Sequence, residues 1–396
     1  MESATDPVRR FAVNKAFSLK NNPLSGIALS GWAAMLWRYG GAIEWRKYWL
    51  RALFLSFMAI VNGIFALLDW IFFAHTIVKA KLHPSPVFIL GHPRTGTTLM
   101  HNLLSKDDEQ FYFCTTFQAG FPSGFAILNK ISWLFAGFVD ERRPMDNMKL
   151  GLSMPQEDEL ATNVLSGGKS QYMSIFLPRL ERGCFRQFVN FEDATIYDFS
   201  CWRQSFMFLL KKLSAVNDGG SGKRRLLLKS PVHTGRVRLL LKLFPNAQFI
   251  YLHRDPYRVY QSAANMADKA YPYMYLHTPD NIHVQEFILS QFEQLHSLYV
   301  RDRKLIPKGN LIEIAFEDLA NNQEETIARI YTHLKWPNVD RMRAAVREHQ
   351  KTNKSYKKNN FSTLSKAEKK MVARRWKQAF DEFDYKIEQD DDRKEL

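Results

Sequence analysis

A long stretch of hydrophobic residues dominates the first quarter of the chain. No charged residue occurs between Ala52 and Leu68, and after Asp69 the hydrophobic run continues to Ala74. A membrane-spanning helix needs roughly 20 apolar residues, and this run reaches that length only if Asp69 is tolerated. The pattern predicts a membrane-associated segment over residues 45–82. It leaves three arrangements open: a transmembrane helix, a segment at the membrane interface, or a helix packed in a soluble core.

Basic residues flank this run, and more of them precede it than follow it. Arg46, Lys47 and Arg51 lie before it, and Lys79 and Lys81 lie after it. A spanning helix would therefore place the N-terminus in the cytosol. The basic segment over residues 1–44 shows no cleavable signal pattern. In a eukaryote we would expect the membrane to be that of the endoplasmic reticulum or the Golgi.

Short apolar segments alternate with amphipathic ones along the rest of the chain. Three segments are typical of buried strands, and helical periodicity follows each of them: residues 86–90, 226–228 and 247–254. Pro245 ends the helix expected over 234–244, and Asp255 and Pro256 have the pattern of an N-cap and a first helical residue. This alternation predicts an α/β fold, with a parallel sheet flanked by helices.

The first of these strands runs into a glycine-bounded loop, Gly91 to Thr98. A strand, a loop of this kind and a helix together direct backbone N–H groups at a phosphate. The spacing from Gly91 to Gly96 matches the ATP-binding phosphate loop, but Thr97 stands where that loop has its lysine. Enzymes that use ATP need this lysine and magnesium to manage the charge on the phosphates. A sulfuryl donor, whose transferred group carries one charge, could dispense with both.

Two further strand ends carry basic residues. Lys229 ends the second apolar segment, and Arg254 ends the third. Ser262 lies eight residues beyond Arg254, inside the helix that follows. An arginine at a strand end and a hydroxyl on the next helix can hold one phosphate from two sides.

The composition agrees with a globular, anion-binding protein. Of the 396 residues, 46% are hydrophobic and 24% charged, which excludes a disordered chain and a fibrous rod. The net charge of +15 favours nucleotides, nucleic acids or acidic lipid surfaces as partners. The three cysteines are too few for a disulfide framework, and their spacing matches no metal site.

The chain resembles the sulfotransferases that use 3′-phosphoadenosine 5′-phosphosulfate (PAPS), and it is most similar to a branch common in bacteria and microbial eukaryotes. The segments that carry the resemblance are PVFILGHPRTGTTLM from Pro86, PQEDE from Pro155, LKSPVHT from Leu228, FPNAQFIYLHRDPYRVYQS from Phe244 and FEDL from Phe316. It extends over roughly residues 45 to 386 and implies a phosphate-loop α/β fold.

The resemblance also implies site residues. The 5′-phosphosulfate would be bound by the first loop: His92, Pro93, Arg94, Thr95, Gly96, Thr97 and Thr98. Arg254 and Ser262 would bind the 3′-phosphate, and Lys229 would reach the bridging oxygen of the leaving nucleotide. The base that accepts the acceptor's proton has three candidates, of which Glu157 is preferred over Glu159 and His233.

Together these observations predict a sulfotransferase domain over residues 83–386 and an acidic tail over 387–396. We expect PAPS as co-substrate, no metal, and a small-molecule, lipid or glycan hydroxyl as acceptor. A kinase-like phosphotransferase is the alternative, disfavoured by Thr97. A basic nucleic-acid-binding module would explain the charge but not two phosphate motifs, so we expect no nucleic-acid partner. The acceptor and the oligomeric state stay open.

Overall fold

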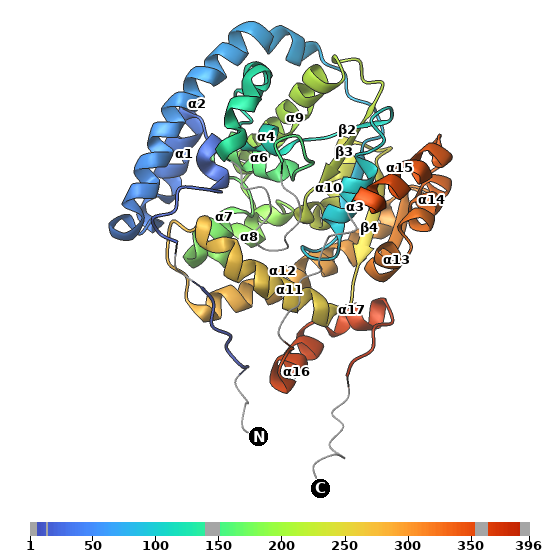
Figure 1. Cartoon of the computed structure of the whole chain (residues 1–396). Coiled ribbons are helices and arrows are strands. Elements are labelled where there is room, and N and C mark those ends of the chain that lie inside the picture. Colours follow the sequence, from blue (N-terminus) through green and yellow to red (C-terminus); the bar gives the residue numbers. More distant parts are fainter. Residues whose placement is uncertain (1–5, 13–14, 139–150, 353–362, 389–396) are drawn as a thin grey trace.

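The computed structural model of the chain describes residues 6–12, 15–138, 151–352 and 363–388. Its centre is one sheet of five parallel strands in the order β2-β3-β1-β4-β5 (Figure 1). The strands are β1 (Val87–Leu90), β2 (Phe111–Tyr112), β3 (Arg225–Lys229), β4 (Gln248–His253) and β5 (Leu311–Ala315). The predicted α/β class with a parallel sheet is therefore confirmed. The sequence pattern does not predict β2 and β5.

Helices cover both faces of the sheet, as the alternation of side chains along each strand requires. Phe88 and Leu90 of β1 point into a core to which many helices contribute, among them α1 (Leu29–Tyr39), α2 (Trp45–Lys79), α9 (Ile196–Asn217), α10 (Val237–Leu243) and α12 (Asn281–Asp302). Val87 and Ile89 point to the opposite face, which α3 (Thr97–Leu104), α13 (Phe316–Asn321), α14 (Gln323–His333) and α15 (Val339–Thr352) cover.

A third core lies beside the sheet and joins segments distant in sequence. It is built from α8 (Glu181–Val189), α11 (Pro256–Lys269), α12, α16 (Lys366–Arg375) and α17 (Lys377–Glu382). The remaining α-helices are α4 (Thr116–Gly120), α5 (Phe125–Leu128), α6 (Asp158–Leu165) and α7 (Met173–Phe176). The expected acidic tail lies outside the described residues from Gln389 onward.

Two local predictions can be compared with the observed helices. Asp255 caps α11, accepting a hydrogen bond from the Arg258 N–H, and Pro256 is its first residue, as predicted. The helix expected over 234–244 is instead divided into a 3-10 helix, η5 (Pro231–Arg236), and α10. At Gly235 a Cβ atom would lie 3.0 Å from side-chain atoms of Val189 and Leu298. The 3-10 turn therefore lies where α8 and α12 approach η5 closely.

The strand order determines where a ligand can bind. The chain leaves β1 toward β2 on one side of the sheet, and it leaves β4 toward β5 on the other. In open parallel sheets, ligands bind at such a reversal, beyond the carboxyl ends of the strands. The loops that follow β1 and β4, which carry the predicted phosphate-binding residues, therefore lie side by side.

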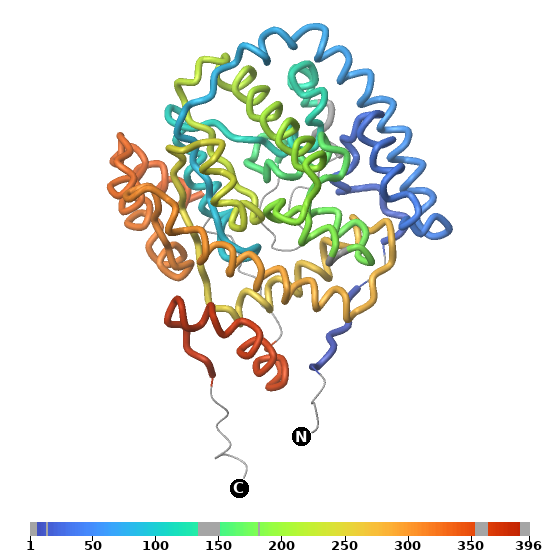
Figure 2. Tube along the Cα trace, turned by 180° about the vertical axis from the view of Figure 1, so that it is seen from behind, coloured from blue at the N-terminus to red at the C-terminus, as the bar shows by residue number. Residues whose placement is uncertain are grey.

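The hydrophobic run forms α2, which is, within the described residues, the one helix long and apolar enough to cross a membrane. Leu55 and Ala59 of α2 belong to the same core as the sheet residues Phe88 and Leu90. In Figures 1 and 2, α2 curves along the outer edge of the molecule, outside α1. One side of α2 is therefore part of the domain.

Candidate active site

The loop after β1 has the backbone of an anion cradle. Gly91 and Gly96 have φ angles of 139° and 95°, which side-chain-bearing residues rarely adopt. A Cβ atom on Gly91 would lie 2.6 Å from the carbonyl oxygen of Leu252, and one on Gly96 would overlap the ring of Phe316. Both positions therefore require glycine, and the loop leads directly into α3 at Thr97.

The arginines of the two loops converge. Arg94 Nε donates a hydrogen bond of 2.9 Å to Ser262 Oγ, and Arg254 Nη1 donates one of 3.3 Å to the Arg94 carbonyl oxygen. The Arg254 guanidinium lies 4.1 Å from the ring centroid of Phe316, and its buried Nε has no hydrogen-bond partner. Burial lowers the pKa of Arg254; Glu317 opposes this shift, whereas the charges of Arg94 and Arg258 add to it. This crowding of positive charge suits a dianionic ligand.

The remaining loop residues differ in what they can contact. The His92 ring packs 5.0 Å from that of Phe292, and burial lowers its pKa to about 3, so it is neutral. Thr95 Oγ1 donates to the His92 carbonyl oxygen at 2.9 Å and stabilises the turn. Thr97 is buried, whereas Pro93 and Thr98 are partly exposed. His92 and Thr95 therefore support the loop.

Lys229 and Glu157 form an ion pair beyond the carboxyl end of β3. Lys229 Nζ lies 2.8 Å from Glu157 Oε1, and the Tyr172 hydroxyl donates to Oε2 of the same carboxylate. The Glu157 side chain is 19% exposed, while that of Lys229 is 3% exposed. Glu157 is the N-cap residue of α6, so its side chain stands at the end of the helix. The preferred base candidate and the candidate catalytic lysine thus occupy one partly open position.

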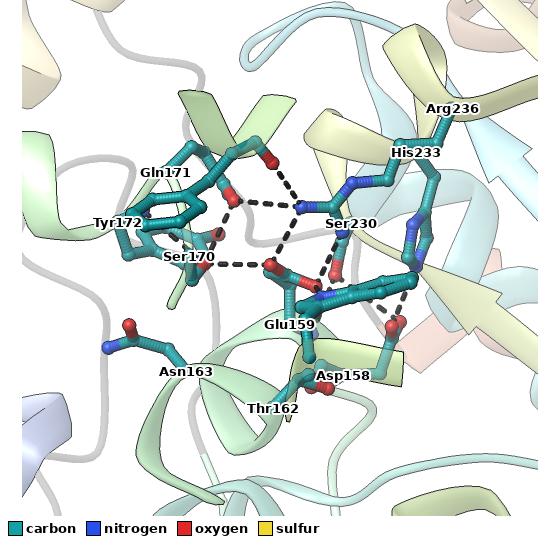
Figure 3. Close-up of polar contacts among 12 residues, drawn as sticks. Asp158, Glu159, Thr162, Asn163, Ser170, Gln171, Tyr172, Ser230, His233 and Arg236 are labelled. Atoms are coloured by element: carbon teal, nitrogen blue, oxygen red, sulfur yellow. Dashed lines mark hydrogen bonds and ion pairs between the residues drawn. The ribbon is translucent and has the colours of Figure 1, made fainter. Parts of the chain in front are cut away.

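The other two base candidates are fully buried in hydrogen-bonded pairs (Figure 3). His233 Nε2 lies 2.6 Å from Asp158 Oδ2, and Ser230 Oγ donates to Asp158 Oδ1 at 3.2 Å. Burial raises the pKa of Asp158, but the neighbouring His233 outweighs this, and the net pKa is lowered. This pair connects η5 to α6 beneath Glu157.

Glu159 has the most complete set of hydrogen bonds at the site. Arg236 Nη1 donates to Oε2 at 2.7 Å, and Nη2 donates to Oε1 at 3.0 Å. Trp202 Nε1 also donates to Oε2, and Ser170 Oγ to Oε1. The side chains of Glu159 and Arg236 are 0% exposed. Because its lone pairs are occupied and no solvent reaches it, Glu159 is placed to hold α6 rather than to accept a substrate proton.

The partners of these acids were not identified from the sequence. Asp158 lies in the PQEDE segment and Ser230 in LKSPVHT, but neither segment indicates a role for them, and Tyr172 and Arg236 carry no local signal. The Lys229–Glu157 pair joins residues 72 positions apart, and the Arg236–Glu159 pair 77. In the described part of the chain, no group of three His, Cys, Asp or Glu side chains could hold a metal ion.

A buried histidine beside the site is expected to make the free energy of unfolding fall at acidic pH. Burial lowers the pKa of His101 in α3 to about 3, and the Lys229 charge contributes to the shift. The unfolded chain takes up this proton near pH 6.5, so a fall from pH 7.5 to 5.5 should favour unfolding by ~1.4 kcal/mol through this group. Urea denaturation of wild type and His101→Gln at both pH values would measure it. A difference in unfolding free energy that stays constant with pH would contradict the prediction.

The sequence and fold match known proteins over most of their length. The sequence profile of the Sulfotransferase family matches residues 86–341, more than half of the chain. The omega-hydroxy-beta-dihydromenaquinone-9 sulfotransferases Stf3 of Mycobacterium bovis and Mycobacterium tuberculosis are both 27% identical to it over 360 residues, which cover 91% of this chain and 90% of theirs.

Two solved structures share the fold. Sulfotransferase STF9 from Mycobacterium avium matches with a TM-score of 0.63 and 18% identity, over 92% of this chain and 98% of its own. Sulfotransferase STF1 from Mycobacterium tuberculosis H37Rv matches with a TM-score of 0.60 and 16% identity, over 88% and 91%.

Proposed function

The chain belongs to the sulfotransferase family, and from this premise we propose that it transfers the sulfuryl group of PAPS to the hydroxyl of a lipophilic acceptor. The observation that carries the proposal is the pairing of Glu157 with Lys229 at the carboxyl edge of the sheet, next to the convergent arginines.

The site's own residues support PAPS as the donor. The 3′-phosphate would be bound by Arg254 and Ser262. The buried Arg254 Nε has no hydrogen-bond partner, and Ser262 lies next to the arginines because its Oγ accepts a hydrogen bond from Arg94 Nε. The 5′-phosphosulfate would lie against the loop after β1, whose backbone conformation depends on glycine at positions 91 and 96. Both groups are anions, which the +15 net charge favours.

The reaction follows from the positions of Glu157 and Lys229. The acceptor oxygen attacks sulfur while the bond from sulfur to the bridging oxygen breaks, and the bond's electron pair leaves with the nucleotide phosphate. Glu157 takes the hydroxyl proton. Lys229 stabilises the charge that develops on the bridging oxygen, which requires it to leave Glu157 Oε1. Tyr172 holds the second carboxylate oxygen meanwhile, so Glu157 keeps its orientation.

A lipid hydroxyl is the acceptor class that we favour over a glycan. The Stf3 relatives act, by their name, on an omega-hydroxylated menaquinone. The exposed side of α2 is strongly apolar and would bring the domain to a membrane where such a lipid resides. Membrane association is therefore part of the proposal. The endomembrane location expected for a eukaryote has no support, since the Stf3 relatives are bacterial.

Binding of the product nucleotide PAP tests the donor site. Calorimetric titration in EDTA should show binding by the wild type and a roughly 10- to 100-fold weaker affinity for Arg254→Ala, because a charge-assisted contact to the 3′-phosphate is lost. Arg341→Ala is the matched control, since Arg341 pairs with Asp108 and Glu109, which precede β2 at the opposite edge of the sheet.

A phosphotransferase would bind different nucleotides. Binding of ATP with magnesium, together with no PAP binding by the folded protein, would overturn the proposed function. Unchanged PAP affinity in Arg254→Ala would instead reject the assignment of the 3′-phosphate site.

A further inference from the structure

The exposed side of α2 is a continuous hydrophobic stripe. Six of its residues are between 53% and 62% exposed although all are large and apolar: Trp49, Leu53, Phe57, Ile60, Ile64 and Leu67. Their spacing of three or four residues places them on one face of the helix. With Trp45 and Val78 at its ends, the stripe extends for about 50 Å at 1.5 Å per residue. This is far more than a scattered set of surface hydrophobic residues.

Hydrogen bonds and an ion pair bind the opposite side of α2 to the domain. Asp69 lies 2.5 Å from Lys212 of α9 and also accepts the Ile127 N–H at 2.9 Å; both ionic side chains are almost fully buried. Asn62 Nδ2 donates to the Ser25 carbonyl oxygen at 2.8 Å, and the buried Arg51 donates to several backbone carbonyls, including that of Lys15 at 2.6 Å. If α2 left the domain to cross a bilayer, Lys212 would lose its counterion, and three polar side chains would enter hydrocarbon.

The charges around the stripe indicate the kind of surface that it contacts. Asp69 is the one acidic residue between Trp45 and Lys79, and it is buried. Exposed basic residues stand at both ends, with Arg46 at one and Lys79 and Lys81 at the other. Tryptophans 45, 49 and 70 are about half exposed or more, and tryptophan favours the headgroup region of membranes. An apolar stripe between basic ends fits an anionic lipid surface.

We propose that α2 lies in the plane of one leaflet of an anionic membrane, with its stripe inserted and its polar side bound to the domain. The length agrees, because 35 residues of helix extend about 52 Å, well beyond the roughly 30 Å of a bilayer core. The arrangement deepens the proposed membrane association but does not depend on sulfuryl transfer.

Vesicle flotation tests the lipid surface. The full chain should bind vesicles containing phosphatidylglycerol about tenfold or more tightly than pure phosphatidylcholine vesicles. The triple variant Leu53→Gln, Phe57→Gln, Ile64→Gln should lose on the order of tenfold or more of this binding, as less apolar area is inserted. The control triple Ile282→Gln, Leu305→Gln, Ile387→Gln removes exposed hydrophobic residues outside α2 and should bind like the wild type.

Labelling of introduced cysteines separates in-plane binding from a span. Lys20→Cys precedes α2 and Lys308→Cys follows it, and both lysines are exposed. In sealed vesicles from expressing cells, an impermeant maleimide should label both from the same side, against the wild-type background. Labelling from opposite sides would show a span and overturn the proposal.

Two further outcomes would also overturn it. Equal vesicle binding by the stripe variant and the wild type would exclude insertion of the stripe. A wild type that forms a dimer in solution and does not float, while the stripe variant is a monomer, would show that a second copy covers α2. PAP titration of the same stripe variant should be unchanged, so a failed donor site would be recognised separately.

Discussion

Glu157→Gln is expected to lower the rate constant of sulfuryl transfer by about 10²- to 10⁴-fold, the contribution typical of a positioned general base. Glutamine has nearly the same shape and can still accept a hydrogen bond from Lys229, so the local structure should persist. It cannot take a proton from the acceptor hydroxyl. Single-turnover transfer from labelled PAPS would measure the rate, and PAP titration should show an unchanged affinity because Glu157 lies outside the phosphate contacts.

The control for Glu157 is another ion-paired carboxylate that is remote from the site. Glu192 pairs with Arg301 at the surface, at 2.7 Å, and Glu192→Gln should transfer sulfuryl groups at the wild-type rate. If folded Glu157→Gln retained full activity while His233→Gln lost it, the base would be His233, acting through a rearrangement that exposes it. That result would reject the role proposed for Glu157.

Local features of the fold could be predicted because each depends on neighbouring residues. The strand of residues 86–90 and the glycine loop behind it are adjacent in sequence, as are the Asp255 cap and Pro256. β2 and β5 could not be recognised so easily. β2 has two residues, and Glu313 interrupts the apolar pattern of β5 because its side chain is exposed at the edge of the sheet.

The pairing within the site could not be predicted for a different reason. The PQEDE segment contains three adjacent acids, and nothing in their order shows which faces solvent. The start of α6 separates them: Glu157 occupies the N-cap position, where its side chain is partly exposed, while Asp158 and Glu159 point into the interior. Their partners come from η5, which the sequence places more than 70 residues away.

The polar residues within the hydrophobic run indicate which side of the helix contacts the domain. Arg51, Asn62 and Asp69 are 11 and seven residues apart, spacings that bring them to one face of a helix. This helical periodicity of the polar positions favours a helix that packs on the domain along one side over a helix that is surrounded by lipid. What the sequence could not show is the partner of each group, since Lys212 lies more than 140 residues beyond Asp69.

Arg236→Met is expected to destabilise the fold by about 3–5 kcal/mol, because it leaves the Glu159 carboxylate buried without its counterion. Arg236 also donates to the carbonyl oxygens of Val189 and Phe188, both at 2.7 Å, so it joins η5, α6 and α8. Urea denaturation would measure the loss, and Arg329→Met is the control: its half-exposed pair with Asp318 should contribute less than about 1 kcal/mol.

The double variant Glu159→Gln, Arg236→Met separates the charge from the packing. Without a buried charge in either position, it should be more stable than Arg236→Met alone, since the penalty of the unpaired carboxylate is removed. Glutamine retains an acceptor for Trp202 Nε1 or Ser170 Oγ. Equal stability of the single and double variants would contradict an uncompensated charge as the cause and assign the loss to the carbonyl contacts of Arg236. The position of Glu157 depends on the same contacts, because Glu159 holds the first turn of α6 and Glu157 is the N-cap residue of that helix.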